Sequence, residues 1–227
     1  MVMPNLEQVR ARIATAARGV GRSPAEIRLV CVTKGVEPKQ IQEAIACGVQ
    51  EIGENRIQEA QAKQSIIGRE VRWHLVGHLQ RNKAKHAVEL FDVIHSVDSL
   101  ALIEALDRQA AARGVGAASQ VLEVLIQVNV SGEATKSGCK PEETKELALA
   151  LLKSQSLKWA GLMTMAPFSD DPEQARPFFR QLRELRDRLQ EKFVRSSLHL
   201  SMGMSQDFEV AVQEGATMVR IGTAIFR

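Results

Sequence analysis

Residues 27–54, IRLVCVTKGVEPKQIQEAIACGVQEIGE, contain the unit that decides the fold. The apolar run at 27–34 is rich in β-branched residues, which indicates a strand. Apolar side chains then recur at helical spacing between Pro38 and Gly48, where proline can begin a helix and glycine can end it. A second short strand follows at 50–53. The stretch is therefore expected to fold as strand, helix and strand.

The same alternation continues to the end of the chain. Further strands are predicted at 72–76, 92–96, 121–130, 157–164, 198–201 and 217–221. Helical patterns lie between them, at 55–65, 81–90, 99–113, 141–154, 172–193 and 205–214. Another amphipathic helix opens the chain and is expected to end near Gly19 and Gly21. Every strand but the last is thus expected to lead into a helix.

Strict alternation of strands and helices predicts a parallel sheet with right-handed crossovers. Eight such units favour closure into a barrel. An open dinucleotide-binding sheet is disfavoured, because the turn after the first strand reads TKGVEP and lacks the glycine pattern of such sites. No linker or shift in composition divides the chain. We predict an α/β fold, a single (β/α)8 TIM-type barrel over residues 1–227 with an extra N-terminal helix.

Composition excludes several classes of protein. The net charge is +3 from 30 basic and 27 acidic residues, a balance that points to neither nucleic acid nor membrane as partner. The basic stretch HLQRNKAKH (78–86) lacks interleaved aromatic residues and is expected to be a solvated helix face. Three cysteines without CxxC spacing predict neither disulfides nor a zinc site. With no transmembrane run and no signal peptide, a cytoplasmic protein is expected.

In a (β/α)8 barrel the active site lies at the C-terminal ends of the strands. Lys34 closes the first strand and is expected to point into the barrel mouth. Partial burial there would lower its pKa and leave some neutral amine, the form that attacks a carbonyl group to make a Schiff base. The alternative is that Lys34 is an ordinary solvated lysine.

Small residues gather after the last two strands, in SMGMS (201–205) and IGT (221–223). Barrels often hold phosphate between these two loops, where backbone N–H groups and a helix N-terminus can converge. The alternative is that Ser205 only caps a helix and that Gly203 and Gly222 are only turn residues.

Several motifs together resemble the pyridoxal 5′-phosphate homeostasis protein family over essentially the whole chain. They are VTKGVEPKQIQEAIACGVQEIGENRIQEA, WHLVGHLQRNK, IQVNVSGEATKSGC, GLMTMAP and LSMGMSQDFEVAVQEGATMVRIGTAIF. The resemblance implies a barrel like the N-terminal domain of alanine racemase, with pyridoxal phosphate (PLP) as cofactor.

The resemblance also implies a role for individual residues. Lys34 would form the Schiff base, and Arg220 would face the pyridine nitrogen. Asn55 and Met163 would line the ring pocket, and the strand-three loop with His78 and Asn82 would lie near the mouth. The phosphate would lie among Ser201, Gly203, Met204, Ser205, Gly222 and Thr223. No catalytic residue and no metal ligand is expected.

Two function classes compete. The first is a binding protein that buffers or delivers PLP inside the cell, with little or no catalysis; its partners would be PLP, related B6 vitamers and apo PLP-dependent enzymes. The second is an enzyme: an amino-acid racemase of the alanine racemase type or, without the resemblance, an aldolase-like barrel using Lys34 on a phosphorylated sugar. That racemase mechanism needs a tyrosine, supplied with a second domain, opposite the lysine. The chain has no tyrosine, which favours binding. We expect a monomer.

Overall fold

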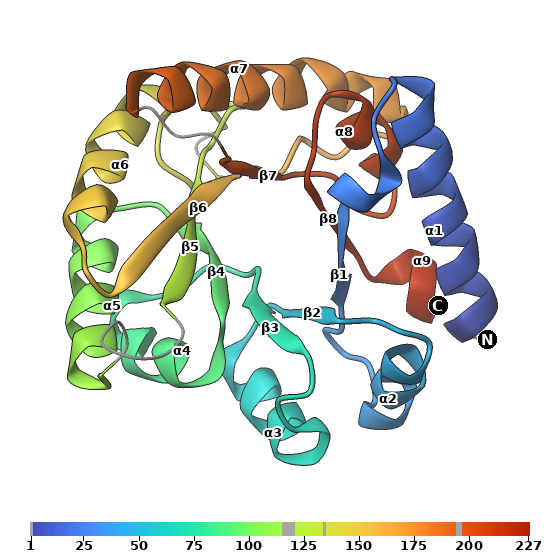
Figure 1. The fold of residues 1–227 in the computed structure, drawn as a ribbon, viewed down its shortest axis with the longest axis horizontal. Helices are drawn as coiled ribbons and strands as arrows, with labels where there is room; N and C mark the ends of the chain where they lie inside the picture. Colours follow the sequence, from blue (N-terminus) through green and yellow to red (C-terminus); the bar gives the residue numbers. More distant parts are fainter. Residues whose placement is uncertain (1, 115–120, 134, 194–196) are drawn as a thin grey trace.

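Eight parallel strands close into a barrel and follow one another around it in sequence order (Figure 1). The computed structural model describes residues 2–114, 121–133, 135–193 and 197–227. The strands are β1 Arg28–Val32, β2 Glu51–Glu54, β3 Arg72–Leu75, β4 Val93–Val97, β5 Leu122–Gln127, β6 Leu157–Met163, β7 His199–Ser201 and β8 Met218–Ile221. Pairing of β1 with β8 closes the ring. The predicted barrel and its eight strands are confirmed.

The helices form an outer ring around the strands (Figure 1). They are α1 Val2–Gly19, α2 Pro38–Ala46, α3 Ile57–Ile67, α4 Ala84–Leu90, α5 Leu100–Ala112, α6 Thr144–Lys153, α7 Arg176–Phe193, α8 Phe208–Gln213 and α9 Thr223–Phe226. Short 3-10 turns lead into α4, α6 and α7. One expectation is wrong: β8 is followed by a helix, α9. Its four residues are too few to give a helical period in the sequence.

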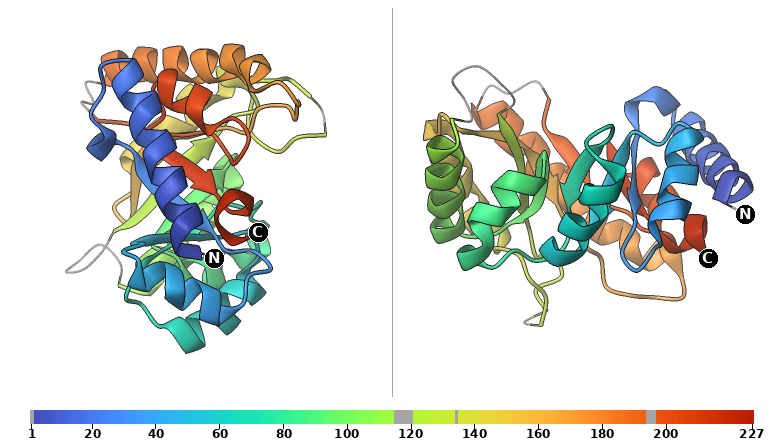
Figure 2. Two further views of the ribbon diagram at one scale, coloured as in Figure 1. Left: turned by 90° about the vertical axis from the view of Figure 1, so that its right-hand side faces the viewer. Right: turned by 90° about the horizontal axis from the view of Figure 1, so that it is seen from below.

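The N-terminal helix covers the part of the barrel that α9 is too short to cover. Helix α1 contacts α8, α9 and α2, and Figure 2 shows it lying across the side of the barrel where both termini end. Asn5 donates from Nδ2 to the carbonyl of Ile225 at 3.1 Å. Arg12 donates to both carboxylate oxygens of Glu209, at 3.1 and 2.7 Å. The predicted extra helix therefore completes the outer layer.

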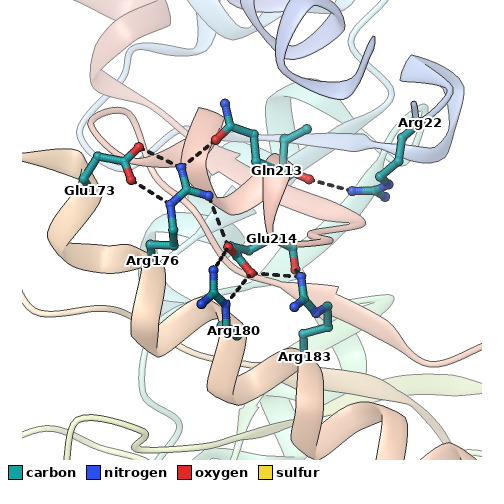
Figure 3. Close-up of polar contacts among 8 residues, drawn as sticks. Arg22, Glu173, Arg176, Arg180, Arg183, Gln213 and Glu214 are labelled. Carbon is teal, nitrogen blue, oxygen red and sulfur yellow. Dashed lines mark hydrogen bonds and ion pairs between the residues drawn. The ribbon is translucent and has the colours of Figure 1, made fainter. Parts of the chain in front are cut away.

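Helix α8 is tied to α7 by one nearly buried carboxylate (Figure 3). Glu214 follows α8 and accepts hydrogen bonds from three arginines of α7: Arg176 at 3.1 Å, Arg180 at 3.0 Å and Arg183 at 2.8 Å. Burial pushes the pKa of Glu214 up, but the hydrogen bonds from Arg180 and Arg176 outweigh burial and lower the pKa overall. This contact fixes the helix that follows the β7 loop.

The barrel interior is more polar than the layers of branched aliphatic residues typical of this fold. Five apolar residues pack together there, Val93, Leu125, Ala160, Met163 and Met218. Among them lie buried polar side chains that include His74, His95, Ser201 and Arg220. The three cysteines are free. Within the described ranges, no helix has the length and apolar character to cross a bilayer.

Candidate functional site

A cavity of about 560 Å³ opens at the end of the barrel where the strands finish. Its volume lies in the ~300–1,000 Å³ range of small-molecule sites. The apolar part of its wall includes Val32, Val36, Val76, Met165, Ala166, Pro167 and Phe168. Three cations, Lys34, Arg220 and Arg227, and two carboxylates, Asp171 and Asp207, also line it. The cavity thus suits a flat, largely apolar ligand that carries negative charge.

Lys34 lies two residues beyond the end of β1 and lines this cavity. The turn that carries it is closed by a hydrogen bond from the Val36 N–H to the Thr33 carbonyl, 3.0 Å. Gly35 has φ +66, a left-handed conformation that favours glycine. The side chain of Lys34 is exposed. The partial burial that the sequence led us to expect is therefore absent.

A buried ion pair lies behind this turn. Lys63 of α3 donates from Nζ to the Thr33 carbonyl at 2.6 Å and to Glu54 Oε1 at 2.7 Å. The Thr33 hydroxyl donates to the same Glu54 oxygen, and the Gly35 N–H donates to Glu59 at 3.1 Å. Helix α3 therefore holds the residues on both sides of Lys34. These contacts give the lysine a fixed backbone.

The loops after β7 and β8 meet at the wall of the cavity next to β1. The Ala224 N–H donates to Ser205 Oγ at 3.3 Å, which joins the two loops. Asp207 Oδ1 accepts from the Met204 N–H at 2.6 Å and closes the first loop on itself. A Cβ added to Gly222 would lie 2.7 Å from the Val32 carbonyl oxygen, so only glycine lets β8 end this close to β1.

Arg220 supplies positive charge at the floor of the cavity. Its side chain is buried and is held by Ser201 Oγ, which accepts from Nη1 at 2.6 Å, and by the Thr164 carbonyl, which accepts from Nη2 at 2.9 Å. Burial lowers the pKa of Arg220 to about 10, while the nearby charge of Asp207 raises it. The guanidinium is therefore charged at neutral pH.

Most predicted site residues line this one cavity. They are Lys34, Asn55, Met204, Ser205, Arg220, Gly222 and Thr223. Three others do not line it: Met163 lies in the barrel interior, Ser201 contacts Arg220, and Gly203 is a buried residue of the β7 loop. A Cβ on Gly203 would lie 2.6 Å from Ala211 Cβ, so this glycine lets the loop pass over α8.

Sequence reasoning did not identify some of the residues that line the cavity. Asp207 shapes the β7 loop, and Phe168, whose side chain is 78% exposed, stands at the rim. His78, expected near the mouth, has Nδ1 3.9 Å from Asp98 Oδ2 and does not line the cavity. Two other histidines, His74 and His95, are fully buried, and His199 is partly buried. Across the described ranges, no cluster of three potential metal ligands occurs.

The residues present fit PLP. An apolar wall faces the lysine, an arginine lies at the floor, and hydroxyl groups of Ser205 and Thr223 stand at the junction of the two loops. The space beside Gly222 would be filled by any larger residue. These features match an aromatic ring with an aldehyde, a ring nitrogen and a phosphate.

Comparison with known proteins gives one family. A sequence model described as "Alanine racemase, N-terminal domain" matches residues 5–227. The pyridoxal phosphate homeostasis protein of Aquifex aeolicus is 43% identical over 222 residues, covering 97% of this chain and 95% of its own. That of Escherichia coli K12 is 40% identical over 228 residues, covering 98% and 94%. PipY of Synechococcus elongatus, in a structure with PLP bound, has a TM-score of 0.85 at 35% identity, covering 100% of both chains.

Proposed function

The chain belongs to the family described as the alanine racemase N-terminal domain and, within it, to the pyridoxal phosphate homeostasis proteins, and we propose that it binds PLP and takes part in the homeostasis of this cofactor. The observation that carries the proposal is one cavity in which Lys34, Arg220 and the joined loops after β7 and β8 face the same space. PLP, when bound, supplies an aldehyde that a lysine amine can attack.

The residues of the cavity divide the recognition of PLP among them. Lys34 would take the aldehyde, and Arg220 would face the ring nitrogen. Asn55 would lie beside the ring. Met204, Ser205, Gly222 and Thr223 would hold the phosphate. Met163, in the barrel interior, and Gly203, a buried residue of the β7 loop, would contribute from outside the cavity.

The proposed role is to hold and release the cofactor rather than to turn over a substrate. With PLP bound, the positive charge of Arg220 beside the ring nitrogen would disfavour protonation of the ring and make it a poorer electron sink. The chain also has no tyrosine to act as a second acid–base group. A racemase is the alternative. Buffering of B6 vitamers and delivery to apo-enzymes are parts of the same proposal, and the monomeric state stays a prediction.

The test is chemical fixation of the bound cofactor. Purified protein is incubated with PLP, reduced with borohydride, digested and mapped by mass spectrometry. We expect the label on Lys34, and we expect Lys34→Ala to lose both the label and the visible absorbance of the bound cofactor. Lys39→Ala is the matched control, because Lys39 is an exposed lysine five positions further along that does not line the cavity. Label on another lysine in the wild-type protein would overturn the assignment.

A further inference from the structure

A row of buried polar side chains crosses the barrel from the cavity floor toward its other end. Arg220 Nη1 donates to Ser201 Oγ at 2.6 Å. Ser201 Oγ lies 2.8 Å from His95 Nδ1, and His95 Nε2 lies 2.8 Å from His74 Nδ1. Beyond it, His74 Nε2 lies 3.5 Å from Glu51 Oε2, and neither atom has a hydrogen-bond partner among the described residues. Ser201, His95 and His74 are each 0% exposed, so no solvent competes for their hydrogen bonds.

The cavity end of this row fixes the direction of its hydrogen bonds, and the charge at the other end is consistent with that direction. At the cavity end, arginine can only donate, so the Ser201 oxygen accepts and its own proton is free to go to His95 Nδ1. A neutral His95 then carries its proton on Nε2 and donates it to His74 Nδ1. His74 in turn carries a proton on Nε2. This proton faces the Glu51 carboxylate without a hydrogen bond, and the negative charge of the carboxylate favours it. Burial raises the pKa of Glu51, while the charges of Arg28 and Arg72 lower it.

The opposite direction would be unfavourable at both ends. The proton of the Ser201 hydroxyl would have no acceptor, and an unprotonated His74 nitrogen would face the Glu51 carboxylate at 3.5 Å. Buried polar groups without partners cost free energy. Burial lowers the pKa of His74 to about 3, helped by the positive charges of Arg72 and Arg28 and opposed by Glu123. Burial, together with the positive charges of Arg220 and Arg72, lowers the pKa of His95 well below its ordinary value. Both rings are neutral at pH 7.

We propose that Ser201, His95 and His74 form a one-way hydrogen-bond chain that positions the guanidinium of Arg220 toward the ring nitrogen of the cofactor. The proposal rests on the proposed function. Ser201 then acts as a positioning residue through Arg220, rather than at the phosphate where the sequence led us to expect it. This hydrogen-bond chain leaves the Ser201 oxygen free to accept from Arg220 Nη1. The Thr164 carbonyl accepts from Arg220 Nη2, so both terminal nitrogens of the guanidinium are held.

The first test is made on the wild-type protein without ligand, and variants serve only to assign the histidine signals. In ¹⁵N-labelled wild-type protein at pH 7, long-range ¹H–¹⁵N correlation spectra distinguish the two neutral forms of each of the five histidines, with His95→Gln and His74→Gln used only to identify signals. We expect both His74 and His95 to carry the proton on Nε2. A proton on Nδ1 of either ring, or a charged ring, would overturn the one-way chain.

The second test separates positioning from general damage by a cycle of ligands and variants. Ser201→Ala is compared with Ser96→Ala, a buried serine next to His95 whose hydroxyl has no hydrogen-bond partner among the described residues. Each protein is titrated with PLP and with the analogue in which the ring nitrogen is replaced by C–H. We expect Ser201→Ala to weaken PLP binding by about tenfold and to leave the analogue unchanged. Ser96→Ala should change neither.

Each other result has a defined meaning. An equal loss for both ligands would overturn the proposal. So would a loss that disappears when pyridoxal without phosphate replaces PLP, because the hydroxyl would then act on the phosphate. Failure of the wild-type protein to bind PLP would reject the proposed function instead, and the histidine spectra would still decide whether the chain exists.

Discussion

At the scale of single residues, the decisive feature is a lysine that is not in the cavity. Lys63 is 8% exposed and its ammonium lies 2.7 Å from a carboxylate oxygen of Glu54, which is fully buried. Burial raises the pKa of Glu54, while the hydrogen bonds from Lys63 and Thr33 lower it. Removing one partner of such a pair leaves an uncompensated buried charge, whereas removing both costs far less.

We therefore expect Lys63→Met to lower the free energy of unfolding by about 3–5 kcal/mol. The double variant Lys63→Met/Glu54→Met should regain most of that loss. Urea denaturation at pH 7 measures both. Lys39→Met, an exposed lysine of α2, is the control and should stay within about 0.5 kcal/mol of the wild-type protein. A loss for Lys63→Met no larger than that of the control would show that the pair carries no net stability.

The sequence predicts the position of Lys34 but not the contacts that hold the turn on which it lies. The apolar run before Lys34 marks a strand, and the barrel rule places the end of that strand at the mouth. Lys63 has an ordinary helical neighbourhood, and its partner Thr33 lies 30 residues away. His95 and Ser201 are 106 residues apart. Such contacts follow from closure of the barrel, and no local pattern reveals them.

At the scale of elements, side-chain direction is what strand patterns predict least well. Val124 pairs with Trp159 and Leu125 with Gly161, so β6 contains an extra residue opposite β5. Such a bulge breaks the alternation of inward and outward side chains. As a result, Ala160 and Met163 pack in the same interior cluster although they are three residues apart. The strand is predictable from its composition, but the direction of Met163 is not.

The contact between α7 and α8 gives a prediction with a defined pH dependence. Folding lowers the pKa of Glu214 from its ordinary value of 4.5. Its stabilising contribution is therefore complete above pH ~4.5 and is lost as the pH falls through the folded-state pKa. We expect Glu214→Gln to lower the free energy of unfolding by about 2 kcal/mol at pH 7 and by much less in acid.

Thermal or urea unfolding at pH 7 and at about pH 4 and below measures this difference. Glu191→Gln, an exposed glutamate near the end of α7, is the matched control and should have little effect at either pH. A stability difference for Glu214→Gln that stays constant as the pH falls would contradict the assignment of the effect to the carboxylate charge.

At the scale of the whole molecule, closure of the barrel brings together residues from distant parts of the chain. The count of eight strand–helix units predicts closure, and closure places the ends of β1, β7 and β8 around one cavity. The role of α1 as a cover beside α9 was not predictable, because it depends on the shortness of α9. The location of the cavity is therefore predictable from the sequence, while the full set of its acid–base groups is seen only in the folded structure.

Those groups decide between a binding protein and an amino-acid racemase. Racemisation needs proton removal from one face of the substrate Cα and delivery to the other, so two positioned acid–base groups are required. Lys34 could supply one. The chain has no tyrosine, and Asp207, which lines the cavity, already accepts from the Met204 N–H at 2.6 Å. The side chain of Lys34 is exposed, so reacting atoms held on it would be open to water, where a carbanion is poorly protected.

We therefore expect PLP-loaded protein to show no racemase, decarboxylase or transaminase turnover above trace levels with common amino acids. Chiral separation of D- and L-amino acids, together with detection of keto acids, measures it, and Lys34→Ala protein treated in the same way is the blank. Because Lys34 is the one amine expected to take the cofactor, any genuine turnover must disappear in that blank. A Lys34-dependent rate of about 1 per second or faster, the ordinary range for an enzyme, would reject the binding role in favour of the racemase.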